Sequence, residues 1–175
     1  MTSKQNPSLE DQLKMFQKKY YKENKKNIFF KNDQKFDCAS KVTEKFTLNE
    51  LINKSIYIDK EYNIIVSYPL IKTFIHPSIY PNFLDHMEKL TTFVLEKVPS
   101  YTIHIDLQSF TITAAERYSG LIKQFCSIYL QKTEYNDTLK NIYIHNPPTV
   151  IDIIRTMFSP FMSSSSKDKI VVLNN

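Results

Sequence analysis

Residues 101–173 alternate between short β-branched runs and longer amphipathic stretches, and this order limits the fold more than any other feature of the sequence. Strands are predicted at 101–107, 139–145 and 169–173, and the apolar side chains between them recur with the spacing of one helix face. Strands that alternate with helices of this length are typical of a parallel sheet with helices packed on it. We therefore expect an α/β fold built on a mostly parallel sheet.

The segment before this region adds a hairpin and a helix. The β-rich runs 55–58 and 63–68 are separated by a short polar connection, so they are predicted to pair as an edge hairpin of the same sheet. Pro81 suits the first turn of a helix, and Pro99 ends the apolar stripe that follows it. A helix is therefore expected between these two prolines.

Capping signals predict where three further elements begin or end. Thr47 with Glu50, and Thr113 with Glu116, have the spacing of capping boxes, and each pair predicts the start of a helix. The four serines at 163–166 are predicted to form a turn before the last strand.

The first 48 residues are predicted to be a basic helical segment that precedes an α/β core at 49–175. Ser8 is a good N-cap for a helix, and residues 31–45 are too polar to predict an element. The helix after Ser8 is expected to present one apolar stripe formed by Leu9, Leu13, Phe16 and Tyr20.

Positive charge is concentrated at the N-terminus. Residues 1–45 hold 11 lysines and 6 acidic residues, a net charge of +5, and the rest of the chain holds 12 residues of each sign. A polybasic segment attracts anionic lipid head groups. Nucleic acid attracts lysines for the same reason, but we do not expect it as a partner. The alternative interpretation is that these lysines only form the solvent-exposed face of a helix.

The composition excludes several function classes. Gly120 is the only glycine, so a glycine-rich phosphate-binding loop is excluded. Cys38 and Cys126 are far apart, and two lone thiols are typical of a reducing compartment. Because no apolar run is long enough to span a bilayer and the first residues carry no signal-like apolar stretch, a cytoplasmic protein is expected. No cofactor is expected.

The four histidines do not have the spacing of a metal site. His104 and His145 fall on two predicted strands, so a hydrogen-bonded core pair is the favoured interpretation. Asp106 follows near the end of one of these strands, where sites in α/β sheets cluster. A small α/β enzyme that uses these three residues is the least favoured hypothesis, and we predict no catalysis.

The last third of the chain resembles the CRAL-TRIO lipid-binding domain. The resemblance rests on YNDTL (135–139), IYIHNPP (142–148), FSPFM (158–162) and Lys169-Ile170, which follow the family's order of Y-P-E-R-L, N-A-P, K-P-F-L and K-I. HIDLQSF (104–110) resembles the family's D-L-x-G strand end.

This resemblance implies a lipid pocket floored by the sheet and gated by a mobile helix over residues 149–162. In phosphoinositide-transfer members a lysine, a threonine and a glutamate hold the head-group phosphate, and these positions fall on Lys169, Ser166 and Asp137. The implied lipid-binding set is completed by Tyr135, Met157, Phe158 and Phe161. A non-catalytic lipid-binding or transfer module is thus expected, with lipid, including phosphoinositide, and a transient anionic membrane surface as partners.

The departures from the family pattern favour a second hypothesis. Thr138 replaces the arginine of Y-P-E-R, Ser159 replaces the lysine before the P-F pair, and the chain stops after the last strand, as in a minimal, C-terminally truncated domain. HNPPT (145–149) is also similar to the H-P-T of divergent CRAL-TRIO domains such as BCH domains. Those domains bind proteins, so the alternative is a protein-interaction module.

Overall fold

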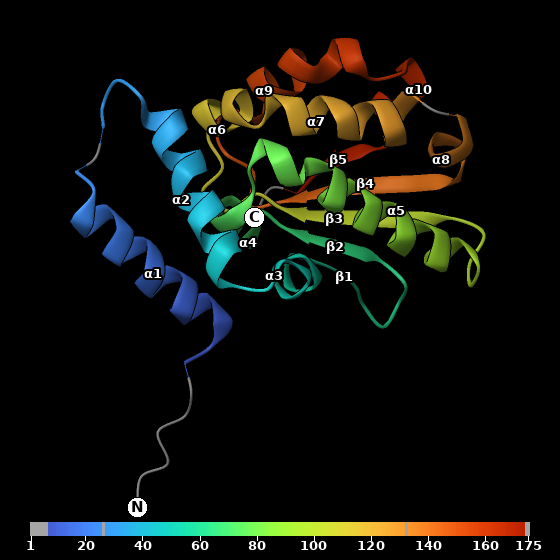
Figure 1. Cartoon of the computed structure of the whole chain (residues 1–175). Coiled ribbons are helices and arrows are strands. Elements are labelled where there is room, and N and C mark those ends of the chain that lie inside the picture. The colour runs from blue at the N-terminus through green and yellow to red at the C-terminus, as the bar shows by residue number, and fades with distance from the viewer. Residues whose placement is uncertain (1–6, 26, 132, 174–175) are drawn as a thin grey trace, which may run out of the picture.

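The computed structural model of the chain describes residues 7–25, 27–131 and 133–173, and within them five strands form one sheet in the order β1-β2-β3-β4-β5 (Figure 1). The first two strands are antiparallel and every later neighbour is parallel. The α/β class, the mostly parallel sheet and the edge hairpin are confirmed. The strands are β1 (Ile56–Ile58), β2 (Ile64–Ser67), β3 (Tyr101–Asp106), β4 (Leu139–His145) and β5 (Ile170–Val172).

Helices precede the sheet and fill its crossovers. The N-terminal helices are α1 (Leu9–Glu23), α2 (Lys31–Lys45) and α3 (Leu48–Ser55). Between β2 and β3 lie α4 (Tyr68–Phe74), η1 (Pro77–Ile79) and α5 (Tyr80–Leu95). Between β3 and β4 lie α6 (Ile112–Arg117), α7 (Ser119–Cys126), the π-helical η2 (Ser127–Gln131) and α8 (Thr133–Thr138). Between β4 and β5 lie α9 (Ile151–Phe158), η3 (Ser159–Phe161) and α10 (Ser164–Lys167).

The pairing register brings aliphatic side chains into rows on one face of the sheet. Because side chains alternate along a strand, residues paired across the sheet share a face. One row is formed by Val66, Ile105, Ile144 and Val172, and the next by Ile64, Ile103, Ile142 and Ile170. The other face carries Ile65, His104, Tyr143 and Val171. The sheet therefore presents one aliphatic face and one mixed face.

The N-terminal helices are built on narrow apolar faces. Ser8 caps α1 as predicted, because its Oγ accepts a hydrogen bond from Asp11 N over 3.2 Å. Leu13 and Tyr20 are buried, while Leu9 and Phe16 are half-buried against the core. Figure 1 shows α1 and α2 side by side at the opposite end of the molecule from α8.

Residues 31–45, which are too polar to predict an element, form α2. Cys38, Ala39 and Val42 are buried on one side of this helix, which packs mainly against α4. Lys31, Lys41 and Lys45 are exposed, whereas Lys35 is half-buried beside this face. Burial of Cys38, Ala39 and Val42 against the rest of the protein stabilises α2, although the polar sequence does not predict a helix.

Residues 68–74 also form a helix, α4, which was not predicted. Pro69 lies in the first turn of α4, where the missing N–H costs nothing. Ile71 and Phe74 are buried, so this helix links the sheet to α2.

The structure tests the three predictions made from capping and turn signals. Thr47 precedes α3 as expected, but its side chain makes no capping hydrogen bond within the described residues. The next box is wrong, because Thr111 and not Thr113 caps α6, accepting from Ala114 N over 3.1 Å. The serine run forms the short helix α10, which Ser163 caps by accepting from Ser166 N.

Candidate functional site

An apolar cavity of about 210 Å³ lies between the aliphatic face of the sheet and the helices that cover it. The sheet provides its floor through residues such as Val66, Ile105 and Ile144. The walls come from α5 and α7, with Met87 and Phe125 among the lining residues. An engineered apolar cavity of about 150 Å³ binds hydrocarbon ligands, so a space of this size and lining is suited to an apolar ligand.

Helix α9 closes one side of this cavity. Ile151, Ile154 and Phe158 face it, and Met162 joins them after the helix ends. Ile153 is absent from the cavity lining and is 55% exposed. The cavity-facing stripe of the predicted gate at 149–162 is therefore narrower than the sequence pattern suggests.

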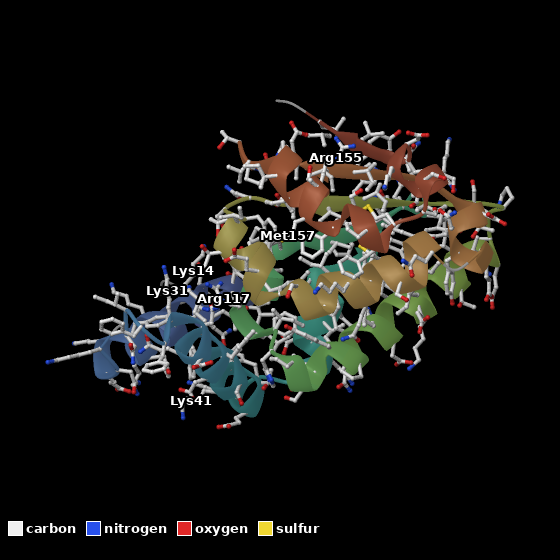
Figure 2. The ribbon with its side chains drawn as sticks, turned by 90° about the horizontal axis from the view of Figure 1, so that it is seen from above. Lys14, Lys31, Lys41, Arg117, Arg155 and Met157 are labelled. Atoms are coloured by element: carbon white, nitrogen blue, oxygen red, sulfur yellow. The ribbon has the colours of Figure 1, made fainter. Side chains whose placement is uncertain are left out.

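The predicted lipid-contacting residues of this segment occupy different positions. Phe158 is buried and lines the cavity. Met157, labelled in Figure 2, and Phe161 are half-buried and pack against the core. The Lys123 ammonium lies 5.0 Å from the centre of the Phe161 ring. This cation–π contact joins the end of the α9 segment to α7.

The predicted head-group residues lie close to Asn136 at the C-terminal end of α8. The Lys169 ammonium donates a hydrogen bond to the Asn136 backbone oxygen, and Asn136 Nδ2 donates to Ser165 Oγ over 3.1 Å. Ser166 is fully buried, and its hydroxyl donates to Ser163 O over 2.9 Å. Asp137 is exposed on α8.

Asn136 was not singled out from the sequence, yet it is the most informative residue of this group. Its side chain is only 7% exposed, and its Oδ1 has no hydrogen-bond partner in the part of the chain that the structure describes. A buried amide oxygen without a donor is costly, so such atoms mark places where a ligand or water supplies the missing hydrogen bond.

Tyr135 supports this end of α8 from inside. Its backbone oxygen accepts a hydrogen bond from the Tyr101 hydroxyl over 3.0 Å, and its ring centre lies 5.2 Å from that of Tyr129. Burial raises the pKa of the Tyr135 hydroxyl. The residue is thus fixed between β3 and η2, and it lies beside the group formed by Asn136 and Lys169.

A polar cleft of about 280 Å³ adjoins the apolar cavity. Arg155 and Ile170 line both spaces, so the two are contiguous. Lys167 contributes a second cation, and the remaining lining residues are Asp152, Thr156 and Ser159. The Arg155 guanidinium lies 3.7 Å from the exposed Asp152 carboxylate. Sequence reasoning missed this cleft, although an arginine inside the apolar stripe of α9 is a visible signal.

The two strand histidines meet on the face of the sheet opposite the cavity. His104 Nδ1 lies 2.8 Å from His145 Nε2, and the rings are stacked. Burial and the neighbouring His145 lower the pKa of His104. Asp106 accepts from Gln108 N and Asn146 Nδ2, each over 2.9 Å, so its recorded bonds shape the turn after β3. The structure thus brings the two histidines together, and it directs the Asp106 carboxylate to the turn.

The described residues were also searched for metal ligands, membrane-spanning helices and reactive thiols, and the outcome limits the kinds of site. His, Cys, Asp and Glu side chains do not form a group of three or more suited to a metal ion in residues 7–25, 27–131 and 133–173. Within the same ranges, no helix is both long and apolar enough to cross a bilayer. Cys38 and Cys126 are buried free thiols, and burial raises the pKa of Cys126 to about 12.

Comparisons with known proteins identify the family. The chain does not match any curated protein. Its structure is similar to the crystal structure of Sfh5, with a TM-score of 0.56 and 17% sequence identity, over 93% of this chain and 66% of that chain. This likeness shows a shared fold.

A family model described as CRAL/TRIO domain matches residues 78–175. The matched region contains β3, β4 and β5, the helices between them, and most of the cavity wall. Members of this family are typically non-catalytic lipid-binding proteins, so the match supports a lipid-binding or lipid-transfer module in general. Because the match covers more than half of the 175 residues, the chain belongs to the CRAL/TRIO domain family.

Proposed function

We propose that the protein binds one membrane lipid, with an acyl chain in the apolar cavity under α9, and carries it without catalysing a reaction. The observation that supports this proposal most directly is the apolar cavity of about 210 Å³ that Ile154 and Phe158 help to line. Each buried methylene contributes about 0.8 kcal/mol, so even a partly enclosed chain gains substantial binding energy.

Binding requires α9 to move. Ligand pockets commonly measure about 300–1,000 Å³, so the present cavity is too small for a whole acyl chain. Helix α9 is eight residues long, and Pro147, Pro148 and Pro160 flank it. Proline interrupts the helical hydrogen bonding on both sides, so α9 is suited to move as one short unit. Outward movement of this unit would enlarge the cavity.

For the polar end of the lipid we propose a phosphoinositide head group at Lys169, Ser166 and Asp137. The Lys169 ammonium has three donors and spends one on Asn136 O, so two remain for a phosphate. Asn136 Oδ1 needs a donor, which an inositol hydroxyl supplies. Asp137 is exposed on α8, and Ser166 would reach the head group only when its bond to Ser163 O opens.

In this proposal residues 49–175 form the lipid-binding core and residues 1–48 are an added basic helical segment. Leu13 and Val42 join that segment to the core cluster. We further propose that the protein is cytoplasmic and touches anionic membranes transiently, because its net charge of +5 lies in residues 1–45.

The test is to incubate the purified protein with mixed phospholipid vesicles, remove the vesicles, and measure bound lipid by native mass spectrometry. One lipid per chain supports the proposal, and release of that lipid on denaturation identifies its class. Recovery of no lipid after this incubation contradicts it and favours the alternative, a protein-interaction module whose pocket stays closed.

The head-group assignment has its own control. Lys169→Ala is expected to lower the recovery of phosphatidylinositol phosphate but not of phosphatidylcholine, because only the former needs the extra cation. Lys140→Ala removes an exposed lysine from β4 and serves as the matched variant. If Arg155→Ala and Lys167→Ala abolish phosphoinositide recovery while Lys169→Ala does not, the head group lies in the polar cleft instead.

A further inference from the structure

The connection between α1 and α2 displays three consecutive large apolar side chains to solvent. Ile28 is 86% exposed, Phe29 is 91% exposed and Phe30 is 63% exposed. Elsewhere in the described residues the large apolar side chains that are exposed occur singly along the sequence, as Phe93 does. Single exposed residues are ordinary, whereas a contiguous exposed group marks a surface that is covered in some functional state.

Hydrogen bonds fix the backbone of this connection. Asn27 Oδ1 accepts from the backbone N of Phe29 and of Phe30, each over 3.0 Å. Asn27 N donates to Gln34 Oε1 over 3.0 Å, and Gln34 Nε2 donates to Lys25 O over 2.9 Å. The side chains of Asn27 and Gln34 therefore satisfy several backbone polar groups of this connection. Figure 1 shows this connection projecting at the far end of the helical pair.

Cations surround the three apolar side chains. Lys22, Lys25 and Lys31 are exposed on either side of the connection. Arg117 of α6 reaches the same end, where its Nε donates to Asn32 Oδ1 over 2.8 Å. Figure 2 labels Lys31 and Arg117 at this end of α2 and α6, and Lys14 and Lys41 farther along α1 and α2.

The local potential is positive. Burial and then the charges of Arg117, Lys31 and Lys72 lower the pKa of Lys35. Glu23 and Asp33 are also exposed near this connection, but residues 1–45 as a whole carry 11 lysines against 6 acidic residues. A second copy that docked through the same segment would bring the same positive charge to the contact, so charge complementarity favours an anionic surface.

We propose that residues 28–30 insert into the interfacial region of an anionic membrane while the surrounding lysines contact the lipid phosphates. The combination of apolar side chains and a basic rim is what interfacial binding requires. Aromatic rings such as Phe29 and Phe30 provide the buried apolar area, and the cations provide the preference for anionic lipid. This docking does not depend on lipid in the cavity under α9.

The absence of tryptophan from the chain gives a direct probe. Phe29→Trp introduces a single indole, whose emission is expected to shift to the blue and to be quenched by brominated lipid when vesicles contain phosphatidylserine. Phe93→Trp is the matched control, because Phe93 is 46% exposed on α5 and has Lys97 5.3 Å from its ring centre. Its emission is expected to stay unchanged.

Vesicle sedimentation supplies the second readout. Phe29→Ala with Phe30→Ala is expected to weaken binding to phosphatidylserine vesicles by about tenfold or more, because removed apolar area no longer enters the membrane. Phe93→Ala is expected to bind like the wild type. Equal binding by the double variant, equal shifts at positions 29 and 93, or a Phe29-dependent dimer without vesicle binding would overturn the inference.

Native mass spectrometry of the same double variant separates this inference from the proposed function. Lipid occupancy of the cavity is expected to stay at the wild-type level when vesicle binding is lost. An empty cavity together with loop-dependent vesicle binding would contradict the proposed function alone.

Discussion

The Tyr20 hydroxyl donates a hydrogen bond to Asp37 Oδ2 over 2.5 Å, and this bond joins α1 to α2. Tyr20 is buried, and burial with the adjacent Asp37 carboxylate raises the pKa of its hydroxyl above the usual range. The hydroxyl therefore remains a donor at physiological pH. The bond holds the two helices that carry the basic end of the molecule.

Removal of this hydrogen bond is expected to weaken the packing of α1 against α2. Tyr20→Phe keeps the ring and deletes the donor, so the free energy of unfolding should fall by about 1–2 kcal/mol in urea denaturation. Tyr57→Phe, at a side chain that is 46% exposed, should change it by less than about 0.5 kcal/mol. An equal effect of both variants would show that the bond contributes nothing.

Neighbouring isoleucines on α9 provide a test of which face closes the cavity. Ile154 is 6% exposed and lines the cavity, so Ile154→Ala should destabilise the protein by about 2–4 kcal/mol. Ile153 is 55% exposed, and Ile153→Ala should cost less than about 0.5 kcal/mol. Thermal or chemical denaturation of the two variants tests the orientation of α9. A larger loss of stability in Ile153→Ala than in Ile154→Ala would contradict this orientation.

Two threonines decide where α6 begins. Thr111→Ala removes the hydroxyl that accepts from Ala114 N, so it should cost about 1 kcal/mol of stability. Thr113 is exposed inside the helix, and Thr113→Ala should leave the stability within about 0.5 kcal/mol of the wild type. If Thr113→Ala lowered the free energy of unfolding more than Thr111→Ala, the helix would begin at the Thr113 capping box, as the sequence suggests.

Stability is expected to fall on mild acidification. Burial lowers the pKa of His76 from 6.5, and burial with the charge of His145 lowers that of His104 from the same value. The unfolded chain therefore binds more protons than the folded chain between the folded pKa values and 6.5. The contribution of the two neutral histidines to stability is fully present above the unfolded-state pKa of 6.5. It is lost as the pH falls through their lower folded-state pKa values.

Urea denaturation at a series of pH values measures this dependence. His76 is 8% exposed and lies between Thr43 Oγ1 at 3.2 Å and Ser78 Oγ at 2.8 Å, so a glutamine keeps polar contacts there without titrating. His76→Gln with His104→Gln should flatten the fall in stability below about pH 6.5. An unchanged slope in this double variant would assign the effect to other groups.

The sheet was predictable from the sequence because strand periodicity is a local signal. The run at 139–145 alternates and is β-branched, and it forms β4 over the same residues. The helix α2 was not predictable, because its buried face consists of Cys38, Ala39 and Val42 among lysines and is stabilised by packing on α4. Local pattern cannot show a partner that is distant in the chain.

The candidate site was predictable only in part for the same reason. Family resemblance identified Lys169, but its contact with Asn136 joins residues 33 positions apart. The polar cleft depends on the approach of Arg155 to Lys167 across two helices, which no local spacing reveals. The apolar cavity itself arises where helix and sheet side chains leave space, and this is a property of packing.

The most direct measurement of the central claim is lipid occupancy, by native mass spectrometry after vesicle incubation, of Ile154→Trp and Ile153→Trp. The indole at position 154 fills the cavity, whereas the indole at 153 projects from the exposed side of α9. We predict that the first variant carries no lipid and that the second carries as much as the wild type. Equal lipid occupancy in both variants would contradict a ligand site under α9.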